Sequence, residues 1–298
     1  MANILVYALH HEGQVNKNSR GALSEAARLA GELGGEAHAV LVGPGTADLA
    51  PQLGSVGATK VWTIDAAEGV AAPAIDGIAA LVDAQGYDYV LFGGGLLNFE
   101  IGAGLAARLG GGITIEVTKI DVEGGKLVAE RPIFGDSVLS HSHYTRKGII
   151  VARTNAFEVK ETGGTATVEA FDAPIGAAAG QVTLKVRGEQ RGADVNIEDA
   201  SILVTGGRGL GNAENFSVAD ALAAALGTGS AVAATRAVVD AGWFPYAGQI
   251  GQTGKSVAPK LYVGLGVSGA IQHKVGMQSS ENVLAINKDE NAPIFEFA

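Results

Sequence analysis

Short apolar runs alternate with helix-like stretches along the first third of the chain. Four of these runs have the length of a β-strand, at residues 3–9, 36–42, 60–64 and 87–92. Runs of this kind, separated by helical patterns, are typical of a parallel sheet covered by helices. The pattern therefore predicts an N-terminal α/β domain with a mostly parallel sheet.

Two helical patterns stand out between these runs. The first follows Asn18, which we interpret as a capping residue before a run of helix formers that stops at glycines 34–35. The second follows Asn98 and repeats apolar residues every four positions along one face. These are Ile101, Leu105 and Leu109.

The pattern changes in the middle of the chain. Between residues 113 and 171 it becomes β-rich, with the turns EGGK and ETGGT, which predicts added antiparallel strands. Residues 173–199 then lose any clear period, and small residues give way to charged ones. We place a domain boundary there, with an N-terminal domain over residues 1–189 and a C-terminal domain over residues 190–298.

The C-terminal part repeats the α/β pattern on a smaller scale. The segment SILVTGG is typical of a buried strand and ENFSVADALAAALG of a helix, and we interpret SAVAATRAVVDAG, KLYVGLG and ENVLAIN as further strands. A strand, a glycine-rich loop and a helix follow one another in this order in dinucleotide-binding folds. The chain is therefore predicted to be α/β throughout, with a Rossmann-like second domain.

Composition and charge narrow the function classes. The 298 residues carry 21 Lys and Arg against 31 Asp and Glu, a net charge of −10. An acidic surface repels a phosphate backbone, which argues against nucleic acid as a partner. Because there is no cysteine, thiolate metal ligands, iron–sulfur clusters and a cysteine nucleophile are excluded, and redox chemistry requires a bound cofactor.

Neither a targeting signal nor a membrane span is evident. The first strand pattern follows Met1 directly and leaves no room for a signal peptide, and the apolar runs are shorter than the ~20 residues that span a bilayer. We therefore expect a cytoplasmic protein that is not inserted in a membrane.

The glycine-rich loop after SILV is a candidate phosphate site. Backbone N–H groups of such a loop can approach a phosphate at a helix N-terminus, and Arg208 adds a guanidinium with paired donors. The glycines at 206, 207, 209 and 211 do not have the G-x-G-x-x-G spacing, so a plain tight turn explains the segment equally well.

A second glycine-rich segment, GQTGKS, resembles the end of a Walker A loop. That motif requires a glycine where Gln249 stands, and the segment follows GWFPY rather than a strand. We therefore reject a nucleoside triphosphatase and keep Thr253 as a hydroxyl on a flexible loop that can approach a ligand.

The segment LYVGLGVSGAIQHKVGM combines a strand, a turn and a histidine. Ser268 is expected to cap a short helix that starts near Ala270, and Gly269 permits the tight turn. The free N–H groups of this turn would face a pyrophosphate, with His273 further along. The alternative for His273 is a partly buried imidazole bonded to a backbone carbonyl.

Five segments of the second domain together resemble the α subunit of electron transfer flavoproteins. They are GGRGLG, ATRAVVDAG, GQIGQTGK, LYVGLGVSGAIQH and AINKDENAPIF, in the family's order and spacing. The first domain is similar to the family in element order and length. The resemblance implies an N-terminal α/β domain that packs on a homologous β subunit, and a C-terminal domain that holds FAD.

The resemblance also implies roles for single residues. Arg208 matches an arginine beside the cofactor, Arg236 one that lies over the isoalloxazine, and Thr235 a hydroxyl on the phosphate region that is usually Ser. The next loop wraps the flavin with Thr253 near N5, the turn before His273 holds the pyrophosphate with this histidine near O2, and Asn287 lies on the diphosphate or ribose. The implied cofactor-binding residues are Arg208, Thr235, Arg236, Gln249, Ile250, Gly251, Gln252, Thr253, Ser268, Gly269, Ala270, Ile271, Gln272, His273 and Asn287.

These roles predict an electron carrier rather than an enzyme. A flavin reduced by one electron becomes an anion at neutral pH only if positive charge lies near its N1–C2=O edge, and Arg236 and His273 can provide it. The protein then supplies orientation and electrostatics to chemistry that belongs to the cofactor.

The resemblance also implies partners for this carrier. The β subunit completes a heterodimer and carries AMP or a second FAD. Electrons come from acyl-CoA dehydrogenases of fatty acid β-oxidation, or similar flavoenzymes, and leave for a membrane quinone oxidoreductase. The alternatives are an NADH-linked electron-bifurcating complex and a non-redox nucleotide-binding module.

Two further features carry less weight. His141 and His143 lie two residues apart, a spacing compatible with a metal on one strand face, but no third ligand stands out and an exposed strand is favoured. Family members usually continue past APIF through a segment near the adenine and a helix that reaches the partner. A protein without that tail would bind the adenine and the partner more weakly.

Overall fold

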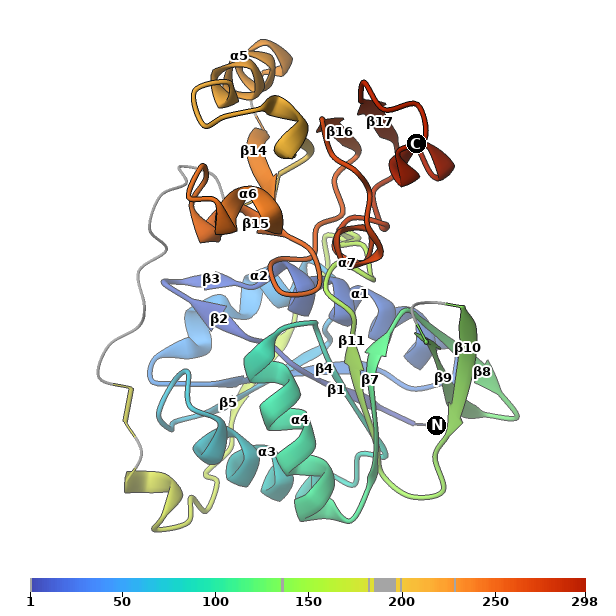
Figure 1. Cartoon of the computed structure of the whole chain (residues 1–298). Coiled ribbons are helices and arrows are strands. Elements are labelled where there is room, and N and C mark those ends of the chain that lie inside the picture. Colours follow the sequence, from blue (N-terminus) through green and yellow to red (C-terminus); the bar gives the residue numbers. More distant parts are fainter. Residues whose placement is uncertain (1, 135–136, 182, 185–196, 199, 228) are drawn as a thin grey trace. The chain divides into compact units, whose positions relative to one another are not determined.

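A computed structural model describes residues 2–134, 137–181, 183–184, 197–198, 200–227 and 229–298 (Figure 1). The chain divides into two compact units, Met1–Arg187 and Gly188–Ala298. The boundary that the sequence predicts at residues 189–190 lies outside the described residues. Each unit contains a parallel sheet with helices, which confirms the α/β prediction.

The first unit is built on a seven-stranded sheet of order β12-β5-β4-β1-β6-β11-β7, in which all neighbours are parallel. The strands are β1 (Ile4–Tyr7), β4 (Ala37–Val42), β5 (Lys60–Ile64), β6 (Tyr89–Phe92), β7 (Gly112–Val117), β11 (Gly148–Ala152) and β12 (Thr167–Ala170).

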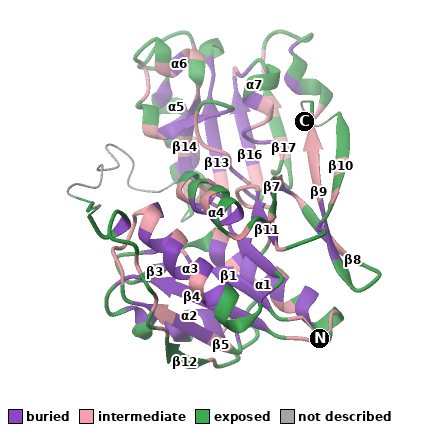
Figure 2. Cartoon of the chain, turned by 90° about the horizontal axis from the view of Figure 1, so that it is seen from below, coloured by how far each residue is buried: buried purple, intermediate pink, exposed green. Residues whose placement is uncertain are grey.

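Helices cover both faces of this sheet. Alternate residues of β1 belong to two apolar clusters, one shared with α1 (Lys17–Glu32) and α2 (Ala50–Gly54), the other with α3 (Ala71–Gln85) and α4 (Leu96–Leu109). The central strands are consequently buried on both sides, as Figure 2 shows. This burial explains why their sequences read as continuous apolar runs.

Two predicted helix starts differ from the structure. Asn16, not Asn18, caps α1, because the Asn16 side chain accepts from the backbone N–H of Asn18 at 2.9 Å. Helix α4 begins before Asn98, whose side-chain amide donates to the carbonyl of Gly93 at 2.8 Å. Asparagine bonds to nearby backbone from several positions around a helix start, so its presence locates the start only to within a few residues.

The region expected to hold antiparallel strands is divided between two sheets. The strands β8 (Lys119–Glu123), β9 (Lys126–Ile133) and β10 (Val138–His143) form an antiparallel sheet. The expectation was wrong for β7, β11 and β12, which join the parallel sheet. Strand β11 is buried at all five positions, as a central parallel strand requires. A short hairpin of β2 (His10–His11) and β3 (Gln14–Val15) precedes α1.

The second unit carries a five-stranded parallel sheet of order β15-β14-β13-β16-β17. Its strands and helices are β13 (Ile202–Gly206), α5 (Phe216–Leu226), β14 (Ser230–Thr235), α6 (Arg236–Asp240), β15 (Gln249–Ile250), β16 (Leu261–Leu265), α7 (Ile271–Lys274) and β17 (Val283–Ile286). The sequence-based expectation that SAVAATRAVVDAG forms one strand is therefore wrong. It forms a strand and then a helix.

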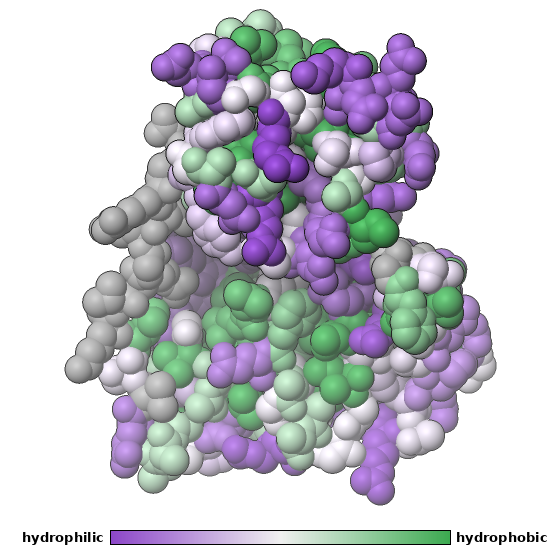
Figure 3. Space-filling view, viewed as in Figure 1, coloured by the Kyte–Doolittle hydropathy of each residue, from purple (hydrophilic) through white to green (hydrophobic). Residues whose placement is uncertain are grey.

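Short 3₁₀ turns complete the described secondary structure; they are η1 (Thr46–Leu49), η2 (Ala179–Gln181), η3 (Arg208–Leu210), η4 (Tyr246–Gly248) and η5 (Pro293–Glu296). No helix within the described ranges is both long and apolar enough to cross a bilayer. Figure 3 shows hydrophilic residues spread over both units on the face that it presents.

Candidate functional site

A cavity of about 580 Å³ lies at the carboxyl ends of the strands in the second unit. The chain runs from β13 outward to β14 and β15, and then returns to β16 and β17 on the other side, so the strand order reverses between β13 and β16. Open α/β sheets bind ligands at such a reversal, and the volume is within the range of cofactor sites. The loops after all five strands contribute residues to the lining.

The glycine-rich loop after β13 lines the cavity and packs against the loop after β16. A Cβ atom added at Gly207 would lie 2.2 Å from the carbonyl oxygen of Gly266, and one at Gly209 would lie 2.6 Å from the Cα of Gly266. Neither position can carry a side chain without displacing backbone. These glycines therefore let two loops meet backbone to backbone, and they keep one wall of the cavity free of side chains.

Two arginines bring positive charge to the cavity. Arg208 is exposed and forms no ion pair with any residue that the structure describes. Arg236 begins α6, and its Nε lies 3.2 Å from a carboxylate oxygen of Asp240, with both side chains more than half exposed. Thr235, directly before Arg236, also lines the cavity. Two guanidiniums and a hydroxyl suit a ligand with phosphate groups.

The loop from Gln249 to Lys255 is closed on itself and hydrogen-bonded to a residue of α7. The backbone N–H of Lys255 donates to the carbonyl of Gln249 at 2.8 Å, and that of Gln252 donates to the carbonyl of Gln272 at 2.7 Å. Gly251 has a φ of +136°, which favours glycine. The fixed path brings Ile250, Gly251, Gln252 and Thr253 to the cavity wall.

The turn after β16 differs in detail from the expectation. Ala270, not Ser268, is the residue before α7, and no side chain caps the helix. The carbonyl of Ser268 accepts from the backbone N–H of Ile294 at 3.0 Å. Gly269 has a φ of +82°, and a Cβ there would lie 2.5 Å from the nitrogen of Ile294, so this position requires glycine.

His273 is buried and fully hydrogen-bonded within the protein. Its Nδ1 lies 3.1 Å from the carbonyl oxygen of Ile250, and its Nε2 lies 2.7 Å from the hydroxyl of Tyr262. Burial lowers the pKa of His273 to about 4. The imidazole is therefore neutral at pH 7, which differs from the positive charge expected of it and agrees with the alternative of a buried histidine bonded to a carbonyl.

The side chain of Asn287 is also hydrogen-bonded within the protein at both its amide nitrogen and its amide oxygen. Its amide nitrogen donates to the carbonyl of Val267 at 2.9 Å, and its amide oxygen accepts from the backbone N–H of Asp289 at 3.0 Å. The side chain therefore joins the loops after β16 and β17 along the cavity.

The structure brings most of the candidate residues together. Those in the lining are Arg208, Thr235, Arg236, Ile250, Gly251, Gln252, Thr253, Ser268, Ala270, Gln272, His273 and Asn287. Three candidates lie outside the lining: Gln249 and Gly269, which are buried, and Ile271, whose side chain is 69% exposed. Sequence reasoning missed Asp240 and Asp289, two exposed acids in the lining. Both stand in segments that carry the family resemblance, ATRAVVDAG and AINKDENAPIF, but only Thr235, Arg236 and Asn287 of these segments are candidates from the sequence.

Metal chemistry has no comparable site in the described part of the chain. No group of three or more His, Cys, Asp or Glu residues there is placed to hold an ion. His141 is exposed and lies 3.0 Å from Glu130 on the neighbouring strand, an ordinary surface pair.

Comparison with known proteins agrees with the location of the cavity. Residues 4–175 match the electron transfer flavoprotein domain, and residues 196–278 match the electron transfer flavoprotein FAD-binding domain. The "Electron transfer flavoprotein subunit alpha" of Mycobacterium leprae (strain TN) is 40% identical over 304 residues, covering 100% of this chain and 92% of that protein. The chain belongs to the electron transfer flavoprotein α-subunit family.

More distant members extend the same relationship. The electron transfer flavoprotein subunit alpha of Thermoanaerobacterium thermosaccharolyticum is 34% identical, covering 99% of this chain and 92% of that protein. "Protein FixB" of Clostridium saccharobutylicum is 36% identical, covering 99% of this chain and 90% of that protein. The family identifies FAD as the cofactor.

The residues of the cavity fit this cofactor. Arg208, which pairs with no acid among the described residues, and the close backbone approach at Gly207 and Gly209 suit a diphosphate, and the closed loop adds the hydroxyl of Thr253 to the lining. The matched FAD-binding segment covers the loops after β13, β14, β15 and β16.

Proposed function

We propose that this chain is the α subunit of a heterodimer that carries single electrons between flavoenzymes and a quinone pool. The observation that supports the proposal most directly is the cavity at the strand reversal, which combines two arginines with glycine-walled loops inside the segment related to FAD-binding domains. In this proposal residues 190–298 form the FAD domain, and residues 1–189 pack on a homologous β subunit that carries AMP or a second FAD.

Different side chains would bind different parts of the cofactor. Arg208, Thr235 and the turn from Ser268 to Ala270 bind the phosphate region, and Asn287 holds the loops that flank it. Arg236 and the loop carrying Thr253 bind the ring system. FAD, when bound, supplies the one-electron chemistry, and the protein contributes orientation and charge to it. Because His273 is neutral, Arg236 is the group that brings positive charge to the ring in this proposal.

The proposal includes the electron donors and the acceptor of this carrier. Acyl-CoA dehydrogenases or similar flavoenzymes would donate electrons, and a membrane quinone oxidoreductase would accept them. Complexes between redox proteins of this kind are small and short-lived, so the chain would need an exposed cofactor edge rather than a deep substrate pocket. Its role is that of a carrier that makes and breaks no substrate bonds.

The test is a visible spectrum of the chain co-expressed with a β subunit, recorded during stepwise anaerobic reduction. We expect a yellow protein that takes up its first electron separately from its second, and that accepts electrons from a reduced acyl-CoA dehydrogenase. Oxidation of NADH by the complex would favour the bifurcating alternative. A colourless protein that binds AMP but takes up no FAD would favour a non-redox nucleotide module.

A further inference from the structure

The side chain of Gln249 is bonded to the side chain of Thr253. The amide nitrogen of Gln249 donates to the hydroxyl oxygen of Thr253 at 3.1 Å. Gln249 is 2% exposed and lies behind the cavity wall, whereas Thr253 is exposed and forms part of the lining. A buried amide therefore supports a hydroxyl that faces the cavity.

Both residues are held in place by the backbone around them. The carbonyl of Gln249 accepts from the N–H of Lys255, and a Cβ added at Gly254 would lie 2.4 Å from that same carbonyl oxygen. On the outer side, the hydroxyl of Tyr246 donates to the main-chain carbonyl of Thr253 at 2.7 Å. Thr253 is thus fixed through its main chain and its side chain together.

The contact with Gln249 determines whether the hydroxyl of Thr253 donates or accepts a hydrogen bond in the cavity. A hydroxyl has one hydrogen, and an amide N–H that points at its oxygen leaves that hydrogen free to point elsewhere. The carbonyl of Thr253 already accepts from Tyr246, and the exposed side of the hydroxyl is the cavity. Thr253 therefore presents a donor to the cavity.

We propose that Gln249 is a positioning residue that keeps Thr253 as a hydrogen-bond donor, so that this end of the cavity selects a ligand atom able to accept. The inference rests on the proposed function, in which the ligand is FAD. The oxidised isoalloxazine has an unprotonated ring nitrogen, N5, that accepts a hydrogen bond. A ring that carries hydrogen at this atom would meet a second donor and bind less well.

The experiment compares FAD with 5-deaza-FAD, in which a C–H group replaces the accepting N5. Both oxidised ligands are titrated into the apo heterodimer, and binding is followed by the absorbance and fluorescence of the ring. For the wild type we expect FAD to bind about three- to tenfold more tightly than 5-deaza-FAD, the effect of one hydrogen bond. The ratio of the two dissociation constants isolates this contact from changes in general affinity.

Four variants test which residue determines the ratio of the two dissociation constants. Thr253→Val removes the hydroxyl and should bring the ratio close to one, while Thr253→Ser keeps the hydroxyl and the ratio. Gln249→Met removes the supporting amide and should lower the ratio to near that of Thr253→Val. Gln249→Glu replaces the donor with an acceptor that draws the hydroxyl hydrogen to itself, and it should lower the ratio even if the methionine variant folds poorly.

A matched control and the opposing results complete the design. Gln85→Met makes the same substitution at an exposed position of α3 and should leave the ratio unchanged. A wild-type ratio in both Gln249 variants, alongside a lost ratio in Thr253→Val, would overturn the role of Gln249. An unchanged ratio in Thr253→Val would show that Thr253 donates nothing to N5. Absence of FAD binding by the wild type would instead overturn the proposed function.

Discussion

The hydroxyl of Tyr262 donates to Nε2 of His273 across 2.7 Å. The direction of this bond follows from the other ring nitrogen, because Nδ1 lies 3.1 Å from a carbonyl oxygen of Ile250 that can only accept. Nδ1 therefore carries the hydrogen, and Nε2 accepts from Tyr262. Burial also raises the pKa of Tyr262, which keeps its hydroxyl protonated as a donor. The pair holds a neutral imidazole in one tautomer beside the cavity.

This arrangement predicts that acid destabilises the second unit through His273. Its pKa is lowered to about 4 in the folded protein from 6.5 in the unfolded chain, mainly by burial. The unfolded state therefore binds an extra proton between these values, and stability falls as pH decreases from 6.5 to 4. The loss should reach about 3 kcal/mol of unfolding free energy. Urea unfolding at several pH values, followed by hydrogen exchange in peptides from β13 and β16, measures it.

His273→Gln is the matched control for this effect. Glutamine keeps a neutral acceptor for Tyr262 but has no group that titrates between pH 4 and 7. The free-energy difference between wild type and variant should therefore change by the same amount across this range. Parallel pH profiles for the two proteins would show that His273 is not the responsible group.

Substitutions of Arg236 and Asp240 should shift the flavin reduction potential in opposite directions. The two charged groups, on the first and last residues of α6, lie 3.2 Å apart and both line the cavity. Arg236→Gln removes positive charge, so it should weaken FAD binding about tenfold and lower the flavin reduction potential. Asp240→Asn removes the opposing charge and should raise the potential. Potentiometric titration of the reconstituted heterodimers decides this, and equal shifts in one direction would contradict the electrostatic account.

The sequence predicts the α/β class and the C-terminal site for a physical reason. Strands buried on both faces read as unbroken apolar runs, and loops that meet backbone to backbone require glycine, so both leave a local signal. The predictions of a helix start after Asn98 and of a cap at Ser268 are wrong because short polar side chains bond to backbone in many local settings. The neutral state of His273 has no local signal, since it depends on Tyr262 and Ile250 arriving from other strands.

Tyr246 is a further residue without a signal in the sequence. Its ring is 66% exposed, yet its hydroxyl donates to the carbonyl of Thr253 from outside the loop. Tyr246→Phe should change global stability by less than about 0.5 kcal/mol because the side chain is exposed. It should nevertheless speed hydrogen exchange at Gln252 and raise the FAD dissociation rate about threefold, since one tie of the loop is lost. Unchanged exchange in this loop would show that Tyr246 does not hold it.

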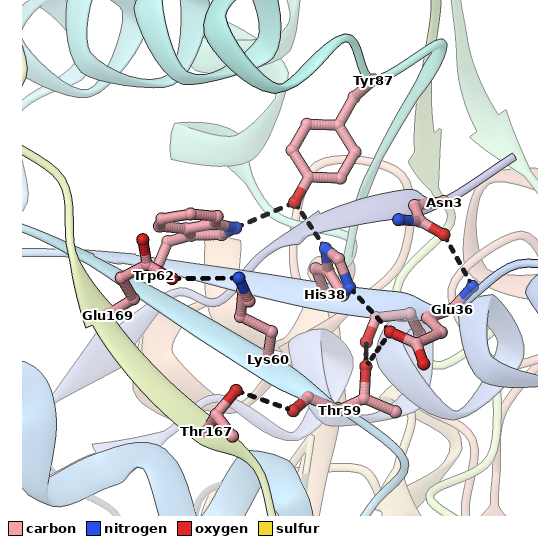
Figure 4. A network of polar contacts seen from close by, with 10 residues as sticks. Asn3, Glu36, His38, Thr59, Lys60, Trp62, Tyr87, Thr167 and Glu169 are labelled. Carbon is pink, nitrogen blue, oxygen red and sulfur yellow. Dashed lines mark hydrogen bonds and ion pairs between the residues drawn. The ribbon is translucent and has the colours of Figure 1, made fainter.

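A buried hydrogen-bond network in the first unit predicts that a tyrosine-to-phenylalanine substitution at Tyr87 lowers the unfolding free energy much more than at Tyr246. The hydroxyl of Tyr87 accepts from the indole N–H of Trp62 at 2.8 Å and donates to Nδ1 of His38 at 2.6 Å, while Nε2 of His38 faces Glu36 at 3.3 Å (Figure 4). Burial raises the pKa of Tyr87 to about 12 and lowers the pKa of His38, so both stay neutral.

Tyr87→Phe leaves the Trp62 donor and the His38 acceptor without partners in an apolar core. Each unsatisfied group costs about 1–3 kcal/mol, so we expect at least about 2 kcal/mol of lost unfolding free energy in the first unit. The same tyrosine-to-phenylalanine exchange at exposed Tyr246 is the control, because it deletes an identical hydroxyl where water can replace it. Urea unfolding followed by tryptophan fluorescence, which reports Trp62 in the first unit and Trp243 in the second, measures the difference. Equal stabilities for the two variants would mean that the core relaxes enough to give Trp62 and His38 new partners.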